Sequence, residues 1–209
     1  MVDKRSSEPG QYPHLAFVVA EPMVPGFFLL LQQGVMIRSR IGCSVERFLR
    51  EELKAAQGTI EKIQSIMLDG KPVDDIGMAV LHDGSTLALS AAMPGLVGAT
   101  LRRGGAYSSL RSAITYHETD NACMPGEGWV NIKVFNLLMA ELGPDLLGKG
   151  VLLGSADLLG FLAERKQELR HGCSVTLDKR SVDVETLAGE GLGNAGKILL
   201  SVSTGPKGV

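Results

Sequence analysis

The sequence predicts an α+β fold made of two tandem units. Short stretches in which apolar and polar residues alternate, typical of strands, are interrupted at residues 43–58 by a helical spacing of apolar residues. Segments of the first half recur in the second half at a nearly constant offset. The 209 residues suffice for two small domains that each bury a core.

The first half begins with strand signals. Residues 14–21 (HLAFVVAE) are predicted as a strand that ends before the prolines following it. Residues 26–42 (GFFLLLQQGVMIRSRIG) are predicted as two strands around a turn at Gln33-Gly34, because the second arm partly alternates.

A helix is predicted next, over residues 43–58. Ser44 is the candidate N-cap, and Gly58 is the candidate stop. One face of this helix is apolar and consists of Val45, Phe48, Leu49 and Leu53.

Two further strands complete the first half. Residues 63–75 are predicted as a strand that runs into a turn at Asp69-Gly70, and residues 85–92 are predicted as another strand. The order strand, strand, helix, strand, strand over residues 26–92 resembles the β-grasp, or ubiquitin-like, fold. The phrase DGSTLALSAA ahead of a glycine-rich tail looks like the last strand of the sulfur carriers of thiamin and molybdopterin synthesis.

The second half repeats parts of the first. Residues 65–75 (SIMLDGKPVDD) match 174–184 (SVTLDKRSVDV), and residues 84–92 match 196–204. Residues 154–169 take the place of the helix. We interpret this as a degenerate internal repeat; the alternative is two unrelated strand-turn-strand units.

The second unit is expected to differ from the first in two ways. Residues 108–117 and 129–136 are predicted as its opening hairpin, and a helical insertion is predicted over 137–153, broken at Gly143-Pro144. The predicted organisation, in order along the chain, is a flexible leader (1–12), a β-grasp-like unit (13–95), a Gly/Arg connector (96–107) and a second β-grasp-like unit (108–209).

The stretch TLRRGG (100–105) has three interpretations. It resembles the tail of ubiquitin, but about half the chain follows it, so a conjugation tail requires cleavage after Gly105. Arg102, Arg103, Gly104 and Gly105 are also a candidate anion site, in which backbone N–H groups and guanidinium groups hold a phosphate or carboxylate. We favour the interdomain connector, because Pro94, Gly95 and Gly98 bend the chain before it.

Other candidate sites are weaker. Gly191, Gly196 and Lys197 nearly spell a phosphate-binding loop, but Ile198 stands where a serine or threonine holds magnesium, and a strand follows where a helix should begin.

The cysteines and histidines give no ligand pattern. Cys43, Cys123, Cys173 and His171 lack the short paired spacing of a zinc site, so neither a metal nor a cofactor is expected. Four aspartates and one histidine stand in predicted turns, and we interpret them as solvated turn residues with no catalytic role: Asp69, Asp74, Asp75, His82 and Asp83.

Charge and composition limit the partners. The net charge of −2 is scattered along the chain, which predicts binding to neither nucleic acid nor an anionic membrane. Three widely spaced cysteines fit a reducing cytoplasm and no disulfide framework. Trp129 is the candidate anchor for a partner or for self-association.

The predicted function is therefore a soluble, non-enzymatic binding or adaptor module with a protein partner. The first alternative is a sulfur-carrier-like protein, or one associated with cofactor metabolism, suggested by residues 83–105. The second is a small-molecule-binding protein or enzyme with a site between the units, using Arg102 and Arg103 with His171 or Cys173.

Overall fold

The computed structural model shows an α+β protein whose chain divides into two compact units. It describes residues 12–118, 125–170, 172–187 and 192–205. Unit 2 is continuous and spans residues 25–146, whereas unit 1 combines residues 1–24 with residues 147–209. This division differs from the predicted boundary at 96–107, because the first strand of the chain pairs with the last ones.

The described strands form a single ten-stranded mixed sheet, to which unit 2 contributes five neighbouring strands in the order β4-β3-β5-β6-β2. The central strands β5 and β6 run parallel, and each of the other neighbours pairs antiparallel. The strands are β2 (Val35–Ile41), β3 (Ser65–Leu68), β4 (Lys71–Pro72), β5 (Thr86–Ser90) and β6 (Gly126–Phe135).

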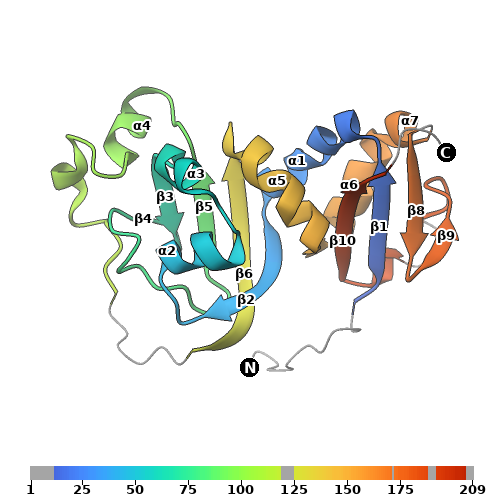
Figure 1. Cartoon of the computed structure of the whole chain (residues 1–209), viewed down its shortest axis with the longest axis horizontal. Coiled ribbons are helices and arrows are strands. Elements are labelled where there is room, and N and C mark those ends of the chain that lie inside the picture. Colours follow the sequence, from blue (N-terminus) through green and yellow to red (C-terminus); the bar gives the residue numbers. More distant parts are fainter. Residues whose placement is uncertain (1–11, 119–124, 171, 188–191, 206–209) are drawn as a thin grey trace. The chain divides into compact units, whose positions relative to one another are not determined.

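Short helices accompany this sheet, and α2 and α3 lie over the face formed by β3, β5 and β6 (Figure 1). Ser44 caps α2 as predicted, because its hydroxyl oxygen accepts a hydrogen bond from the backbone N–H of Arg47 at 3.3 Å. The helical segments from residue 28 to residue 111 are α1 (Phe28–Gln33), α2 (Val45–Arg47), the π-helical η2 (Phe48–Glu52), α3 (Gln57–Lys62), α4 (Gly95–Leu101) and the 3₁₀-helical η3 (Ser108–Arg111).

Unit 1 contributes the other five strands, in the order β7-β10-β1-β8-β9. Here β1 and β10 are the parallel pair, and their outer neighbours are antiparallel. The strands are β1 (His14–Val19), β7 (Val151–Gly154), β8 (Cys173–Leu177), β9 (Arg180–Val182) and β10 (Lys197–Thr204), and the helices are α6 (Ser155–Glu164), α7 (Lys166–Leu169) and the 3₁₀-helical η5 (Leu192–Asn194). Two helices span the unit boundaries in sequence, the 3₁₀-helical η1 (Glu21–Phe27) and α5 (Leu138–Lys149).

The five strands of each unit share one internal layout. In each unit, the strand at one end of the five leads into helices, two parallel strands occupy the centre, and a tight hairpin forms the other end. The hairpin turns also agree: Asp69-Gly70 has φ values of 51° and 79°, and Asp178-Lys179 has 48° and 69°. Two consecutive residues with positive φ are typical of the type I′ turn that suits the twist of a hairpin.

The first aspartate of each turn holds the start of a neighbouring strand. Asp69 Oδ1 accepts a hydrogen bond from the N–H of Thr86 at 2.6 Å, and Asp178 Oδ1 accepts one from the N–H of His14 at 2.9 Å. In both cases the aspartate's own N–H donates to the carbonyl of the same partner at 2.9 Å. His14 therefore corresponds to Thr86, and β1 occupies in unit 1 the position that β5 occupies in unit 2.

Two expected strand pairs are wrong. Residues 28–33, expected as a strand, form α1, in which Phe28 and Leu31 are buried one turn apart. Residues 108–117, expected as half of a hairpin, include the 3₁₀ helix η3. A short apolar run fits a buried helix as well as a strand, so periodicity alone does not separate them. The place beside β2 belongs to β6, whose residues were assigned to the second unit.

Candidate functional site

A long excursion separates β5 from β6 in unit 2, and it carries the candidate site. It includes α4 and η3, and its described residues run to Glu118. Pro94 precedes α4 as its N-cap in extended backbone, and Gly104, with φ of 60°, turns the chain after it. The excursion connects two adjacent parallel strands of one sheet, so residues 96–107 lie inside unit 2.

A buried arginine fastens the excursion to the hairpin of unit 2. The Arg111 side chain is 5% exposed, and its two Nη atoms donate to the carboxylate of Asp74 at 2.6 and 3.0 Å. It also donates to the carbonyl oxygens of Thr100 at 2.6 Å and of Arg102 at 3.2 Å. A bidentate, charge-assisted pair of this kind fixes geometry as well as contributing energy.

The loop predicted to bind an anion contacts the same carboxylate through Gly104, and its neighbouring N–H groups bond to carbonyl oxygens. Gly104 N–H donates to Asp74 Oδ1 at 3.2 Å, Gly105 N–H to Arg102 O at 3.1 Å, and Arg103 N–H to Gln64 O at 2.7 Å. The side chain of Arg102 is exposed and that of Arg103 is half-buried. The anion that the structure places at this loop is the chain's own Asp74; binding of an external anion stays a prediction.

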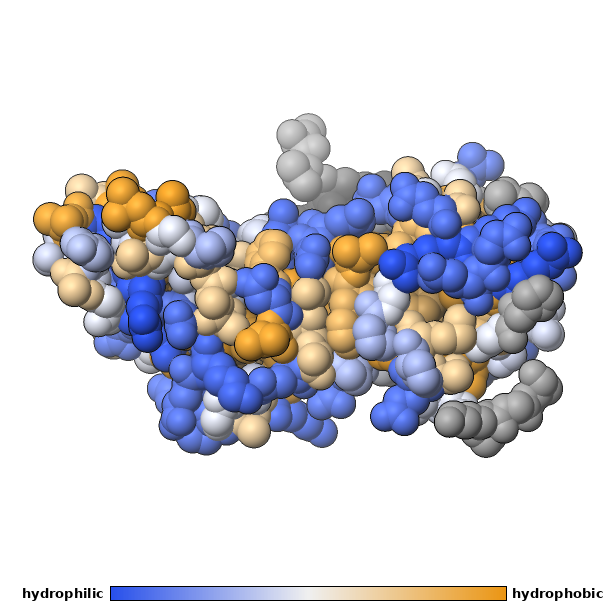
Figure 2. All heavy atoms as spheres, turned by 90° about the horizontal axis from the view of Figure 1, so that it is seen from above, coloured by the Kyte–Doolittle hydropathy of each residue, from blue (hydrophilic) through white to orange (hydrophobic). Residues whose placement is uncertain are grey.

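An apolar patch covers the outside of the excursion. Of the large apolar side chains that are exposed in the described part of the chain, most belong to this one segment. Figure 2 shows orange, hydrophobic residues gathered at the end of the view that α4 occupies in Figure 1. The patch consists of Met93 (37% exposed), Leu96 (75%), Val97 (62%), Tyr107 (46%), Leu110 (79%) and Ile114 (57%).

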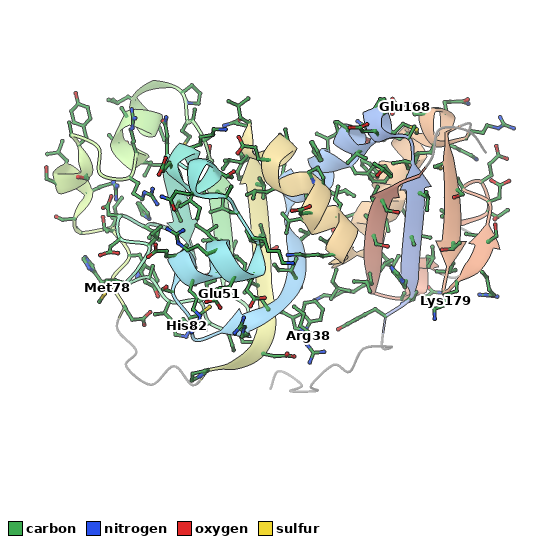
Figure 3. All side chains as sticks on the ribbon, in the orientation of Figure 1. Arg38, Glu51, Met78, His82, Glu168 and Lys179 are labelled. Carbon is green, nitrogen blue, oxygen red and sulfur yellow. The ribbon has the colours of Figure 1, made fainter. Side chains whose placement is uncertain are left out.

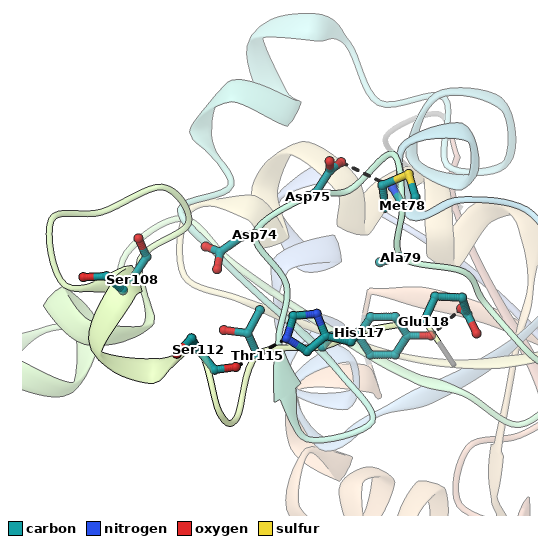
Figure 4. Close-up of a pocket in the computed structure, with 11 residues that line it drawn as sticks. Asp74, Asp75, Met78, Ala79, Ser108, Ser112, Thr115, His117 and Glu118 are labelled. Carbon is teal, nitrogen blue, oxygen red and sulfur yellow. Dashed lines mark hydrogen bonds between the residues drawn. The ribbon is translucent and has the colours of Figure 1, made fainter. Parts of the chain in front are cut away.

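A hollow of about 610 Å³ lies against the same segment. The loop that holds Asp75 and Met78 faces Ser112 and His117 across it (Figure 4). Met78, also labelled in Figure 3, is 68% exposed and extends the patch to this rim. The Asp75 carboxylate accepts hydrogen bonds from the N–H groups of Gly77 and Met78 at 2.8 and 3.3 Å.

A tyrosine and a glutamate form the inner wall of the hollow. The Tyr116 hydroxyl donates to Glu118 Oε2 at 2.7 Å, and His82 Nε2 lies 3.5 Å from the same oxygen. Burial raises the pKa of Tyr116, and the hydrogen bond to Glu118 raises this pKa further. The phenol is therefore held protonated as a hydrogen-bond donor, which suits a binding surface and not general-base catalysis by this group.

The remaining predicted residues have structural contacts. Trp129 is half-buried on β6, where its backbone N–H donates to Asp83 Oδ1 at 2.8 Å and its backbone carbonyl accepts from the Gly84 N–H at 2.7 Å. Its role as a partner anchor stays a prediction. Asp69 and Asp83 both hold strand ends, as expected of turn residues.

The thiols differ from activated nucleophiles. Burial raises the pKa of both Cys43 and Cys173, which disfavours the reactive thiolate. Lys197 begins β10, whereas Gly191, Cys123 and His171 lie outside the described residues. Within the described ranges, no group of three or more histidine, cysteine, aspartate or glutamate residues is placed to hold a metal ion.

Comparison of the chain with known proteins identifies no relative from which a function could be inferred. No family model, no curated protein and no solved structure matches the chain. Over the part of the chain that the structure describes, every helix is too short or too polar to cross a bilayer.

The sequence-based interpretation identified Arg102–Gly105 but missed Arg111 and the apolar patch. Two signals were present. The segment from 93 to 116 contains three arginines and no acidic residue. Leu110 and Ile114 are four positions apart, which suits one face of a helical turn as well as one face of a strand, so the second signal is only that both apolar residues stand in this basic segment.

Proposed function

We propose that this chain is a non-enzymatic protein-binding module and that its partner docks on the apolar patch of residues 93–117. The observation that supports the proposal is the concentration of six exposed large apolar side chains on one short excursion. Single exposed apolar residues are ordinary, but a contiguous group on a segment that adds nothing to the sheet is typical of an interaction site.

The way the excursion is held supports the same conclusion. Arg111 buries its charge against Asp74 and two carbonyl groups, which positions a segment whose outer face is apolar. A preorganised surface loses less conformational entropy when a partner binds. The contacts of Arg111 that hold this segment in place are therefore consistent with a surface that binds a protein partner.

The proposed fold assignment is two tandem β-grasp-like units. It is supported by the common sheet layout and by the equivalent roles of Asp69 and Asp178. Each unit departs from a simple β-grasp in the strand that completes its centre: β6 follows β5 in unit 2, and β1 precedes the rest of unit 1. The free thiols Cys43 and Cys173 support a reducing, cytoplasmic location.

Site-specific photo-crosslinking in cells tests the proposed function. A photoreactive amino acid replaces Leu110, and the matched control carries it at Leu137, another leucine of unit 2 that is 73% exposed but lies outside the patch. We expect a discrete covalent protein adduct at position 110 and none at position 137. Absence of an adduct at 110, or equal labelling of both positions, contradicts the proposal.

A further inference from the structure

We infer that the partner on this face is a second copy of the chain, so that two chains associate through the patch about a two-fold axis. The inference rests on the proposed function, since it names the occupant of the same surface. It is supported by the shape of the surface and by its charges.

The surface offers both a protrusion and a hollow. Leu110, the most exposed large apolar residue of the patch at 79%, lies between Ser109 and Ser112, which line the hollow. Ile114 likewise precedes Thr115 at its edge. In an isologous pair the same surface is used twice, so the protrusion of each copy meets the hollow of the other. A second copy of the patch therefore supplies the apolar surface that the patch needs in a partner.

The charges favour a second copy over a partner of one sign. Arg102 and Asp75 are both exposed, and neither forms an ion pair with another described residue. An acidic partner would attract Arg102 but repel Asp75. A basic partner would attract Asp75 but repel Arg102. A second copy offers one of each, so Arg102 of each chain meets Asp75 of the other and this ion pair forms twice.

Sedimentation equilibrium of the full chain tests the inference, at chain concentrations from about 1 to about 100 µM, a range suited to weak interfaces. We expect a species of twice 22.2 kDa at the upper end. Leu110→Glu should raise the dissociation constant at least about tenfold, as loss of a central apolar anchor does. The matched control Leu137→Glu should leave the dissociation constant unchanged. A single-chain mass throughout, or equal effects of the two variants, overturns the inference.

A charge swap makes the test independent of folding. Arg102→Asp and Asp75→Arg should each weaken association, and the double variant should recover it, because the exchanged charges still meet across the two-fold axis. A misfolded single variant would not be rescued by adding the second substitution. Failure of the double variant to recover association overturns the inference.

The crosslinking experiment separates this inference from the proposed function. An adduct at position 110 of twice 22.2 kDa supports both. A single-chain sedimentation mass with a discrete adduct of another size overturns the second copy and leaves the proposed function standing. No adduct together with a single-chain mass overturns both.

Discussion

Unit 1 and unit 2 arrange five strands in one spatial order but obtain that order from different stretches of chain. In unit 2, β5 follows the β3–β4 hairpin directly and lies beside it, and β6 comes later. In unit 1, the strand that follows the β8–β9 hairpin is β10, yet the strand beside the hairpin is β1, from the other end of the chain. The same spatial order of strands is therefore reached although the strands follow one another along the chain in a different order in each unit.

The units also differ in what they carry. The pair β5 and β6 needs a long connection, because parallel neighbours cannot be joined by a tight turn. Unit 2 uses that connection to present the apolar patch. Unit 1 forms its equivalent pair, β1 and β10, from distant parts of the chain and so has no such connection. The candidate site follows from this topological difference.

The largest expected difference between the units concerns Asp74 and its repeat counterpart Asp183. Asp74→Ala leaves the buried guanidinium of Arg111 without its carboxylate and should lower the free energy of unfolding by about 3–5 kcal/mol. The Asp183 carboxylate is exposed and accepts a hydrogen bond from the Glu185 N–H in its own turn, so Asp183→Ala should lower the free energy of unfolding by about 1 kcal/mol. Urea unfolding of both variants measures this contrast, and equal losses would contradict the structural role assigned to Arg111.

A smaller effect, similar in the two units, is expected where they agree. Asp69→Ala and Asp178→Ala each remove the carboxylate that accepts the first N–H of a neighbouring strand and place alanine at positive φ. Each should lower the free energy of unfolding by about 1–2 kcal/mol, with Asp69→Ala at the upper end because the Ser85 hydroxyl also donates to its carboxylate at 3.0 Å. Urea titrations should show similar shifts; a loss for Asp69→Ala alone would mean that β1 and β5 are not equivalent.

The smallest effect concerns the second residue of each hairpin turn. Lys179, at the tip of the β8–β9 hairpin (Figure 3), has φ of 69° where unit 2 has Gly70 at 79°. Lys179→Gly should raise the free energy of unfolding by roughly 0.5–1 kcal/mol, because glycine adopts this conformation without strain. Gly70→Lys should lower the free energy of unfolding by a similar amount, because lysine is strained at positive φ. No larger loss is expected, since a Cβ there meets no atom within 4 Å. Thermal unfolding checks both signs, and two shifts of the same sign would refute the shared turn geometry.

Local signals made part of this fold predictable from the sequence. The Asp-Gly turn, the start of the helix after Ser44 and the repeat of 65–75 at 174–184 each depend on neighbouring residues, and the structure contains the corresponding elements. The extent of the helices was wrong: the segment after Ser44 ends at Glu52, Gly58 lies inside α3, and α5 continues through Pro144. The choice of pairing partner depends on residues far apart in sequence. For that reason β1 was placed with the first half, and α1 was mistaken for the strand that β6 supplies.

The candidate site was predictable only in part. Arg102–Gly105 drew attention because adjacent basic residues and glycines are a recognisable local pattern. The role of Arg111 depends on Asp74, which lies 37 positions away, and no local rule connects the two. The apolar patch was hidden because an apolar residue in a predicted strand is normally assigned to the core.

The placement of β1 also governs how the chain folds while it is being synthesised. His14–Val19 emerges from the ribosome early, but both of its partners, β8 and β10, lie beyond residue 172. Unit 2 has all its strands once residue 135 has emerged. Nascent chains should therefore complete unit 2 first and carry β1 as an unpaired strand until translation is nearly finished, a period in which chaperones that shield strand edges have their substrate.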